Sequence, residues 1–466
     1  MSQTPIERLR DYLEQLPPRA QALLMREFER AIERGQDATV ANLVLEQLRR
    51  IVRSADDAAA ARTEDPARQL FRPLEPFLVD GKLPVRPGQI RRSSLLPVWQ
   101  WLARDGVPDQ AREFQETLER IRETDTDSGL DQAVRKLQLA AADAIIKLTT
   151  PGPDRDMQRA LARVGSPEVI EDLIPIGSVL QAREVLDTLN ARLPSYLRMF
   201  AESQIGTVTS ALGSPVLQTP KVLPFALSLV MQRLTAPWQI IRLALKMAGS
   251  DDEIRVAATS FGIAVSLALH DLSNFAISLR LDIKRGHFET VADHLKVLHE
   301  GVRGLRTELD LRHDSVWGKQ LAAIRADISN TLQSEIESVP GRVRRLLRQR
   351  PDKDLPAGAR IDEDEVDETA TLIDFVAVCR NYASELAINE VTLRTYSDLQ
   401  HYVEQSTEQL VEALRNADAR TRGYRRAQVT AAVRFCELLF GRDYASLMNR
   451  AAENALAGER KAVRAG

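Results

Sequence analysis

The sequence has few of the residues that build sheets, disulfide scaffolds or membrane spans. It contains 466 residues, of which aromatic side chains make up 5% and only two are cysteines. β-Strands favour aromatic and β-branched side chains, whereas Ala, Leu, Arg, Glu and Gln, which are plentiful here, favour helices. Two cysteines exclude the disulfide-dense frameworks of small secreted proteins. The composition therefore predicts a mainly α-helical protein.

Long apolar runs are also missing. The longest uncharged apolar stretch covers 256–269 and is 14 residues long, whereas a membrane-spanning helix needs about 18–20 residues. The first residues are charged and amphipathic and have no apolar core of a signal peptide. We therefore expect no transmembrane segment and a cytoplasmic location.

Neither sign of charge dominates the chain. Its 63 basic and 66 acidic side chains give a formal net charge of -3. The two signs are mostly interleaved, which is typical of solvated helix faces. A nucleic-acid-binding domain usually carries a basic stripe, so the overall charge selects no class of partner.

Proline is missing from two long stretches, 238–339 and 357–466. Because a proline inside a helix costs about 3 kcal/mol, both stretches can hold long helices. Residues 55–98, in contrast, carry six prolines. This segment is either a linker or an ordered arm on another surface, and apolar residues such as Phe71 and Phe77 favour the arm.

Apolar residues repeat with coiled-coil spacing in both proline-free stretches. The first seam runs from Phe288 to Leu309 over three heptads, and the second runs from Leu372 to Leu414 over six. We expect the seams to cover each other within one chain as an antiparallel hairpin or bundle. The alternative is an intermolecular coiled coil, which would give self-association.

The second seam has weak positions, where we expect incomplete cover and a docking surface for a partner helix. Polar side chains stand on this seam at Asn389, Gln400 and Thr407. The candidate partner-binding residues are Asn389, Leu393, Tyr396 and Gln400. The alternative is that these side chains simply face water.

These patterns predict an all-α fold: a multi-helix bundle or irregular helical array, with long coiled-coil-like antiparallel helices in the C-terminal half. The expected segments are, in chain order, an N-terminal unit of short helices, a Pro-rich arm or linker, a central helical bundle, a charged connector and a C-terminal unit of long helices. Their boundaries are 1–54, 55–98, 99–339, 340–370 and 371–466.

Cys379 and Cys436 both lie at apolar positions of helical patterns. We expect two buried, reduced thiols that are not linked, because cysteine packs as a small apolar residue. A disulfide or redox pair is the alternative.

One short basic cluster stands out near the end of the first proline-free stretch. It holds five arginines, which are the candidate anion-binding residues: Arg342, Arg344, Arg345, Arg348 and Arg350. The acidic run 362–368 follows closely, so the opposite charges can screen each other on a flexible connector. The alternative is a patch for anionic lipid, nucleic acid or an acidic protein.

Sequence motifs for chemistry are missing. There is no phosphate-binding loop, no nucleophile elbow and no His or Cys spacing typical of a metal site. We therefore nominate no catalytic, cofactor-binding or metal-binding residue and expect no cofactor.

Three functions remain open. The favoured one is a non-catalytic helical scaffold or adaptor that binds other proteins. The second is a peripheral binder of anionic membrane or nucleic acid that uses Arg342–Arg350. The third is an all-α enzyme whose site the sequence does not reveal, because helical bundles can assemble sites from scattered residues. We lean toward a protein without catalytic activity.

Overall fold

The computed structural model describes residues 65–466, apart from Lys82, 125–128, 151–154, Ala357 and Gly466. Of the preceding residues it describes only seven: Leu13, Leu24, Met25, Phe28, Val44, Leu45 and Leu48. The short helices predicted for 1–54 thus lie largely outside the described residues. Six of the seven described side chains belong to one apolar cluster around Leu13, Val44 and Leu48.

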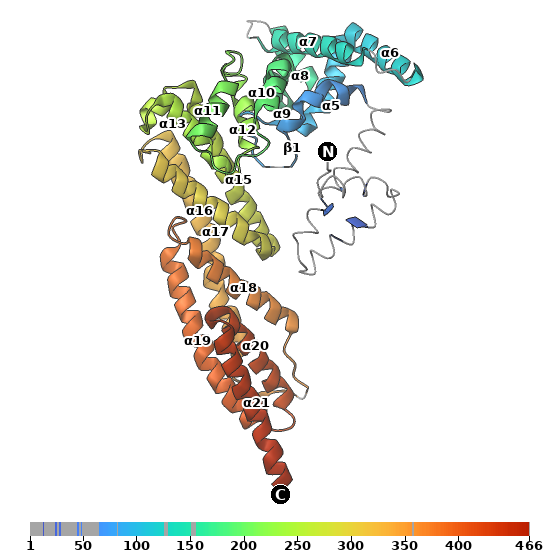
Figure 1. Cartoon of the computed structure of the whole chain (residues 1–466). Coiled ribbons are helices and arrows are strands. Elements are labelled where there is room, and N and C mark those ends of the chain that lie inside the picture. Colours follow the sequence, from blue (N-terminus) through green and yellow to red (C-terminus); the bar gives the residue numbers. More distant parts are fainter. Residues whose placement is uncertain are drawn as a thin grey trace, which may run out of the picture. The chain divides into compact units, whose positions relative to one another are not determined.

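The described chain is all-α, as predicted (Figure 1). It has 18 α-helices and almost no strand. The only named strands are β1 (Leu78–Val79) and β2 (Ile90–Arg91), which pair with each other within the described residues. The chain forms two compact units. Unit 1 contains Met1–Leu78 and Ile90–Gln181, and unit 2 contains Val79–Gln89 and Ala182–Gly466.

Unit 1 has its core between two helices. Its described helices are α4 (Pro66–Phe71), α5 (Leu95–Trp101), α6 (Pro108–Thr124), α7 (Leu130–Thr149), α8 (Arg155–Val164) and α9 (Pro167–Gln181), with short 3-10 or π turns at Arg72–Phe77, Arg92–Ser94 and Leu102–Gly106. Helices α7 and α9 approach closely because Gly177 has no side chain: a Cβ there would stand 2.9 Å from a methyl of Ile145. The contact buries Ile145 and Ile176 completely.

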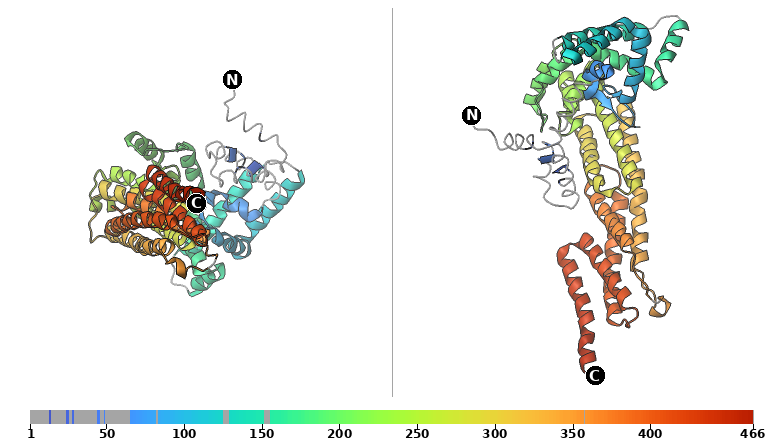
Figure 2. Two further views of the ribbon diagram at one scale, coloured as in Figure 1. Left: turned by 90° about the horizontal axis from the view of Figure 1, so that it is seen from below. Right: turned by 90° about the vertical axis from the view of Figure 1, so that its right-hand side faces the viewer.

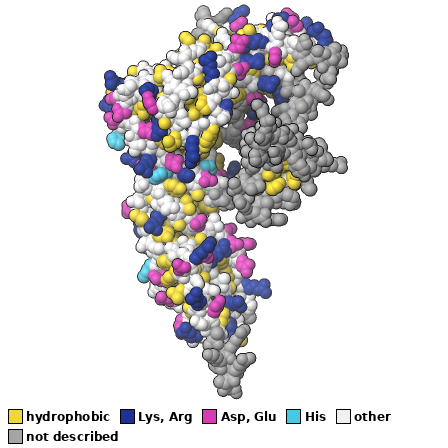
Figure 3. Space-filling model, in the orientation of Figure 1, with side chains coloured by type: hydrophobic (Ala, Val, Ile, Leu, Met, Phe, Trp, Pro, Cys, Tyr) yellow, Lys and Arg dark blue, Asp and Glu magenta, His cyan; other side chains and the backbone are white. Residues whose placement is uncertain are grey.

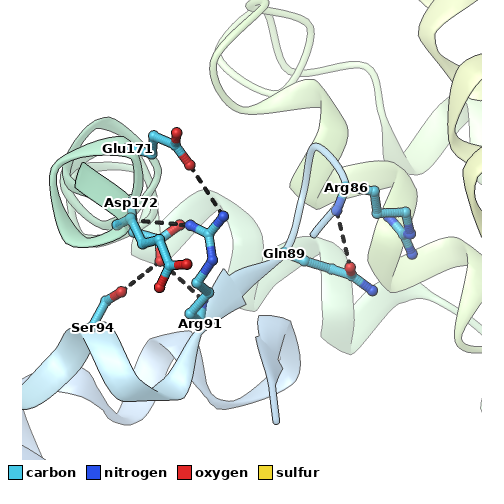
Figure 4. Close-up of polar contacts among 7 residues, drawn as sticks. Arg86, Gln89, Arg91, Ser94, Glu171 and Asp172 are labelled. Carbon is cyan, nitrogen blue, oxygen red and sulfur yellow. Dashed lines mark hydrogen bonds and ion pairs between the residues drawn. The ribbon is translucent and has the colours of Figure 1, made fainter. Parts of the chain in front are cut away.

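A buried carboxylate holds strand β2, with which unit 1 resumes after Val79–Gln89 of unit 2 (Figure 4). The Asp172 side chain on α9 accepts a hydrogen bond from the Ser94 hydroxyl at 2.6 Å and from the Arg91 backbone amide at 3.2 Å. The Arg91 guanidinium adds an ion pair to Asp172 at 3.1 Å and another to Glu171. These bonds satisfy a carboxylate that would be costly to bury alone.

The helices of unit 2 begin with short ones and continue with long ones. The short helices are α10 (Arg183–Arg192), α11 (Glu202–Ala211), α12 (Leu223–Met231), α13 (Ile241–Ala248) and α14 (Glu253–Ala257). The long helices are α15 (Ile263–Arg285), α16 (Val291–Glu308), α17 (Val316–Leu347), α18 (Glu363–Tyr382), α19 (Asn389–Arg415), α20 (Arg422–Phe440) and α21 (Arg442–Ala465). Four 3-10 turns lie at Pro237–Ile240, Ser260–Gly262, Phe288–Thr290 and Asp352–Asp354.

Helix α17 is the longest element of unit 2, and it continues through Pro340 to Leu347. The predicted connector 340–370 therefore begins inside a helix, and its first part is not a flexible segment. Proline removes one backbone hydrogen bond from a helix interior. Here α18 and α19 pack along α17, and the flanking Val339 and Val343 are completely buried. Tertiary packing thus overrides the local preference of proline.

The second seam is divided between two antiparallel helices. Helix α18 ends at Tyr382, and the chain turns through Ala387 at a positive φ of 58° before α19 begins. Side chains of α17 hold this turn: Arg325 donates to the Glu385 carbonyl and Ser329 to that of Ala387. The expectation of one uninterrupted stripe over six heptads was therefore wrong, because tertiary contacts stabilise a turn that no Gly or Pro signals.

The first seam is a buried packing face of α16. Its residues Val291, Leu295, Leu298, Val302, Leu305 and Leu309 are all at most 2% exposed. Helix α16 contacts α15 and α18, so the same chain covers this seam. It runs in the same direction as α18, because Phe288 meets Phe375 and His299 meets Tyr382. The two seams thus contact in parallel, whereas α18 runs antiparallel to α17 and α19.

One segment passes the length and composition test for a membrane span. Among the described helices it is Ser260–Arg285, and half of its most apolar window is buried by other parts of the chain. Helix α15, which makes up most of this segment, packs against α13, α16 and α17. Core helices pass the same test, so the expected lack of a membrane span stays a prediction.

Candidate functional site

Besides α17 and α19, two further helices pack on α18, and these two follow one another along its length. The C-terminal half of α18 packs against α16, with ring centroids of Phe288 and Phe375 5.3 Å apart. The N-terminal half packs against α20, where Arg434 forms an ion pair with Asp367. Helix α20 ends at Phe440, and the turn before α16 begins at Phe288. The end of one helix and the start of the other therefore border the same part of α18.

A recess of about 410 Å³ lies where these helix ends meet, and we call it the notch. Most of its lining is apolar: Phe288, Val291, Ala292, Ala370, Phe375, Val378 and Leu438. Three polar side chains complete it: Thr371, Asp374 and Arg434. The seam residues Phe288 and Phe375 thus line the notch. Figures 1 and 2 show α16, α18 and α20 in the same long bundle from different sides.

The charges at the notch are unevenly matched. Arg434 is engaged by Asp367, and these side chains are 49% and 64% exposed. Asp374 is exposed on α18, two helical turns beyond Asp367. In the described chain, Asp374 forms no hydrogen bond or ion pair. The notch therefore offers an apolar surface with one unmatched carboxylate at its edge.

The predicted partner-binding residues do not lie together on one apolar face. Asn389 and Leu393 are exposed, Leu393 by 48%. The Tyr396 hydroxyl and the Gln400 amide both donate to the Leu439 carbonyl, at 3.0 and 3.2 Å. That carbonyl lies in the last turn of α20, where helix carbonyls have no intrahelical donor. Tyr396 and Gln400 thus serve a bond within the chain.

In the first part of α19 the buried face is shifted by one residue from the predicted seam, whereas the later seam residues Val403, Leu410 and Leu414 are buried as predicted. Thr392 and Thr395 are buried in place of Leu393 and Tyr396. Thr407, expected to be poorly covered, is completely buried, donates to the Val403 carbonyl and contacts the Cys436 sulfur. Threonine satisfies its hydroxyl by bonding back to the preceding turn, so it can occupy a core position.

Three of the five candidate anion-binding arginines have partners in the chain. Arg342 pairs with Glu368 and Arg345 with Glu365, both in the acidic run. The Arg344 guanidinium lies 5.6 Å from the centre of the Tyr402 ring. Arg348 and Arg350 are exposed. The two runs of opposite charge thus meet as neighbouring turns of α17 and α18, whereas a flexible connector was expected. Figure 3 shows both signs intermingled on the visible face.

Both cysteines are buried and free, as predicted. Burial raises the pKa of the Cys379 thiol and of the Cys436 thiol. Their thiolates are therefore disfavoured, which fits a packing role rather than a reactive one.

A second polar site joins the Pro-rich segment to the rest of unit 2. Arg86 is 7% exposed, and its guanidinium reaches Asp271 on α15 at 2.7 Å and Ser228 on α12 at 2.8 Å. The Arg86 backbone amide donates to the Gln89 side chain (Figure 4). Burial raises the pKa of Asp271 against the opposing effect of Arg86. These contacts anchor Val79–Gln89, and we call this segment the strap.

Sequence reasoning missed the strap contacts and the charged residues of the notch. Arg86 stands between Pro84 and Pro87 in an apolar context, which is the only local signal for its burial. Asp374 and Arg434 resemble other solvated charges in the sequence. No group of three or more His, Cys, Asp or Glu side chains that could hold a metal ion occurs among the residues the structure describes.

No protein-family model matches the chain, and neither a curated protein nor a solved structure matches it.

Proposed function

We propose that this chain is a non-catalytic helical adaptor that binds another protein, with the notch as its docking surface. The observation that carries the proposal is the notch itself, a recess of about 410 Å³ whose lining is mostly apolar and in which Phe288, Val378 and Leu438 remain half-buried. Protein interfaces concentrate their binding energy in recesses that receive a few apolar anchors. A helix laid into an apolar groove is a recurring form of such recognition.

The charged side chains favour recognition over the other two functions. Arg434 is already engaged by Asp367, and Asp374, the other charged side chain of the lining, has no ion pair within the described part of the chain. Acid–base catalysis requires titratable groups that converge on one reacting atom. Binding of an anionic membrane or nucleic acid is supported less, because Arg342 and Arg345 are neutralised by Glu368 and Glu365.

Site-specific photo-cross-linking tests the proposal in the cells that produce the protein. A benzoylphenylalanine residue replaces Thr371, which is exposed at the notch, or Gln409, which is exposed elsewhere on α19. We expect a discrete protein adduct from position 371 and none from position 409. A second copy of this chain in the adduct would identify the partner as self. Equal adduct yields at both positions, or none at 371, would overturn the proposal.

A further inference from the structure

We infer that the partner enters the notch with a short amphipathic helix that carries apolar anchors and a Lys or Arg opposite Asp374. This inference rests on the proposed function and adds the chemistry of the occupant. It follows from three properties of the notch: its apolar floor, its unmatched carboxylate and its position between two helix ends.

The floor selects apolar side chains. Phe288 and Phe375 form a tilted aromatic pair, and Val378 and Leu438 continue the surface. A volume of about 410 Å³ admits side chains but no folded domain. Burying apolar area contributes about 25 cal/mol per Å², so one or two large apolar anchors account for the main attraction.

The edge selects a positive charge. Asp367 and Asp374 both stand exposed on α18, and one guanidinium, that of Arg434, faces them from α20. Arg434 is engaged by Asp367, so an entering carboxylate would meet Asp374 without compensation. An entering Lys or Arg would instead pair with Asp374 beside a low-dielectric surface, where charge pairs are stronger than in bulk water. Charge complementarity therefore specifies a basic partner segment.

The position favours a helix. Helices α20 and α16 pack along α18 one after the other, and the notch is the interval between them. A helical segment satisfies its own backbone hydrogen bonds above the apolar floor, whereas an extended segment would bring unpaired amides and carbonyls to it. Residues three or four apart on a helix share one face, so the apolar anchors and the Lys or Arg can point into the notch together.

A peptide-display selection on the full-length chain tests this inference. The probe is a library of random 16-residue peptides, and the chain with Ala292→Trp, which fills the notch from α16, serves for counter-selection. The variant Val378→Trp fills it from α18 and replaces Ala292→Trp if that chain does not fold. We expect notch-dependent peptides with two apolar residues and a Lys or Arg three or four positions from one of them.

The charge is then tested on one selected peptide by fluorescence anisotropy. Asp374→Lys should weaken binding by about tenfold or more, since it replaces attraction by repulsion. Asp398→Lys, at an exposed position of α19 outside the notch, should change it less than about twofold. Replacement of the peptide's Lys or Arg by Glu should restore its binding to the Asp374→Lys variant of the chain.

The outcomes separate this inference from the proposed function. Notch-dependent peptides without a basic residue, or an unchanged affinity for Asp374→Lys, would overturn the basic partner while the docking surface stands. A selection without any notch-dependent peptide would overturn both.

Discussion

Arg86 and Asp271 form an ion pair at 2.7 Å between residues 185 positions apart in the chain. The Arg86 side chain is 7% exposed and that of Asp271 is 22% exposed. The pair lies inside unit 2, but Arg86 belongs to the strap, which the chain inserts between two parts of unit 1. One short segment thus carries a buried charge to a helix that follows much later in the sequence.

Removal of this guanidinium should destabilise unit 2. Arg86→Ala leaves the Asp271 carboxylate without its partner, and loss of one member of a buried pair costs about 3–5 kcal/mol. Because Asp271 keeps some exposure, we expect about 2–3 kcal/mol in the free energy of urea unfolding. Arg394→Ala breaks a more exposed pair, with Glu337, in the same unit and should cost less than about 1 kcal/mol. Equal losses for both variants would contradict a special role of Arg86.

The close approach of Gly88 to Pro224 should make position 88 of the strap intolerant of any side chain. Gly88 has a φ of +81°, and a Cβ there would stand 2.3 Å from the Pro224 carbonyl oxygen. Gly81 also has a positive φ, +101°, but no neighbour within 4 Å. Gly81→Ala should therefore cost only the backbone strain of about 1–2 kcal/mol, whereas Gly88→Ala should in addition displace the strap.

Limited proteolysis measures this displacement directly. Cleavage within Val79–Gln89 should become much faster in Gly88→Ala than in Gly81→Ala. Equal protection of the two variants would show that the strap does not need this contact.

His270 should make the stability of unit 2 depend on pH. Burial lowers the pKa of His270 below its ordinary value of 6.5, and Arg86 acts in the same direction, while Asp271 opposes it. The unfolded chain therefore binds the proton more readily, so the contribution of His270 is complete above about pH 6.5 and is lost as the pH falls below it.

The raised pKa of Asp271 acts in the opposite sense, because stability falls as the pH rises from 3.8 through the folded-state value. Comparison of unfolding free energies for the wild type and His270→Asn between pH 7.5 and pH 5 isolates the histidine. The variant should lose less stability on acidification. A slope equal to that of the wild type would exclude His270 as the cause.

The two donors to the Leu439 carbonyl should be redundant. Tyr396→Phe or Gln400→Ala alone should change stability by no more than about 0.5 kcal/mol through this bond, because the other donor remains. The double variant leaves a buried carbonyl unsatisfied and should cost about 1–2 kcal/mol more than the sum of the single changes. A double-mutant cycle from thermal or urea unfolding checks this coupling. Strictly additive effects would show that the two bonds are independent.

The sequence predicted those features that local periodicity determines. Compositional bias and proline-free stretches predicted the all-α fold, and apolar spacing predicted the buried face of α16 and the burial of Cys379 and Cys436. These inferences succeed because a residue's face on a helix depends only on its neighbours in the same helix.

Other features depend on contacts between distant residues. The turn before α19 is held by Arg325 and Ser329, so no local signal marks it. Thr392 and Thr395 are buried, although the residues that follow them, Leu393 and Tyr396, are more apolar. The notch lies on α18 between the end of α20 and the start of α16. Tertiary packing alone determines which part of α18 each of these helix ends contacts.

The central claim, that the notch receives a partner protein, is tested most directly by the yield of the cross-link formed from position 371. The measurement compares the otherwise wild-type chain with a chain that also carries Ala292→Trp, at matched expression and with unchanged thermal unfolding. We expect the adduct to disappear when the indole fills the notch, whereas Gln409→Trp, on the exposed face of α19, should leave its yield unchanged. An adduct of equal yield in the filled and open chains would contradict the account.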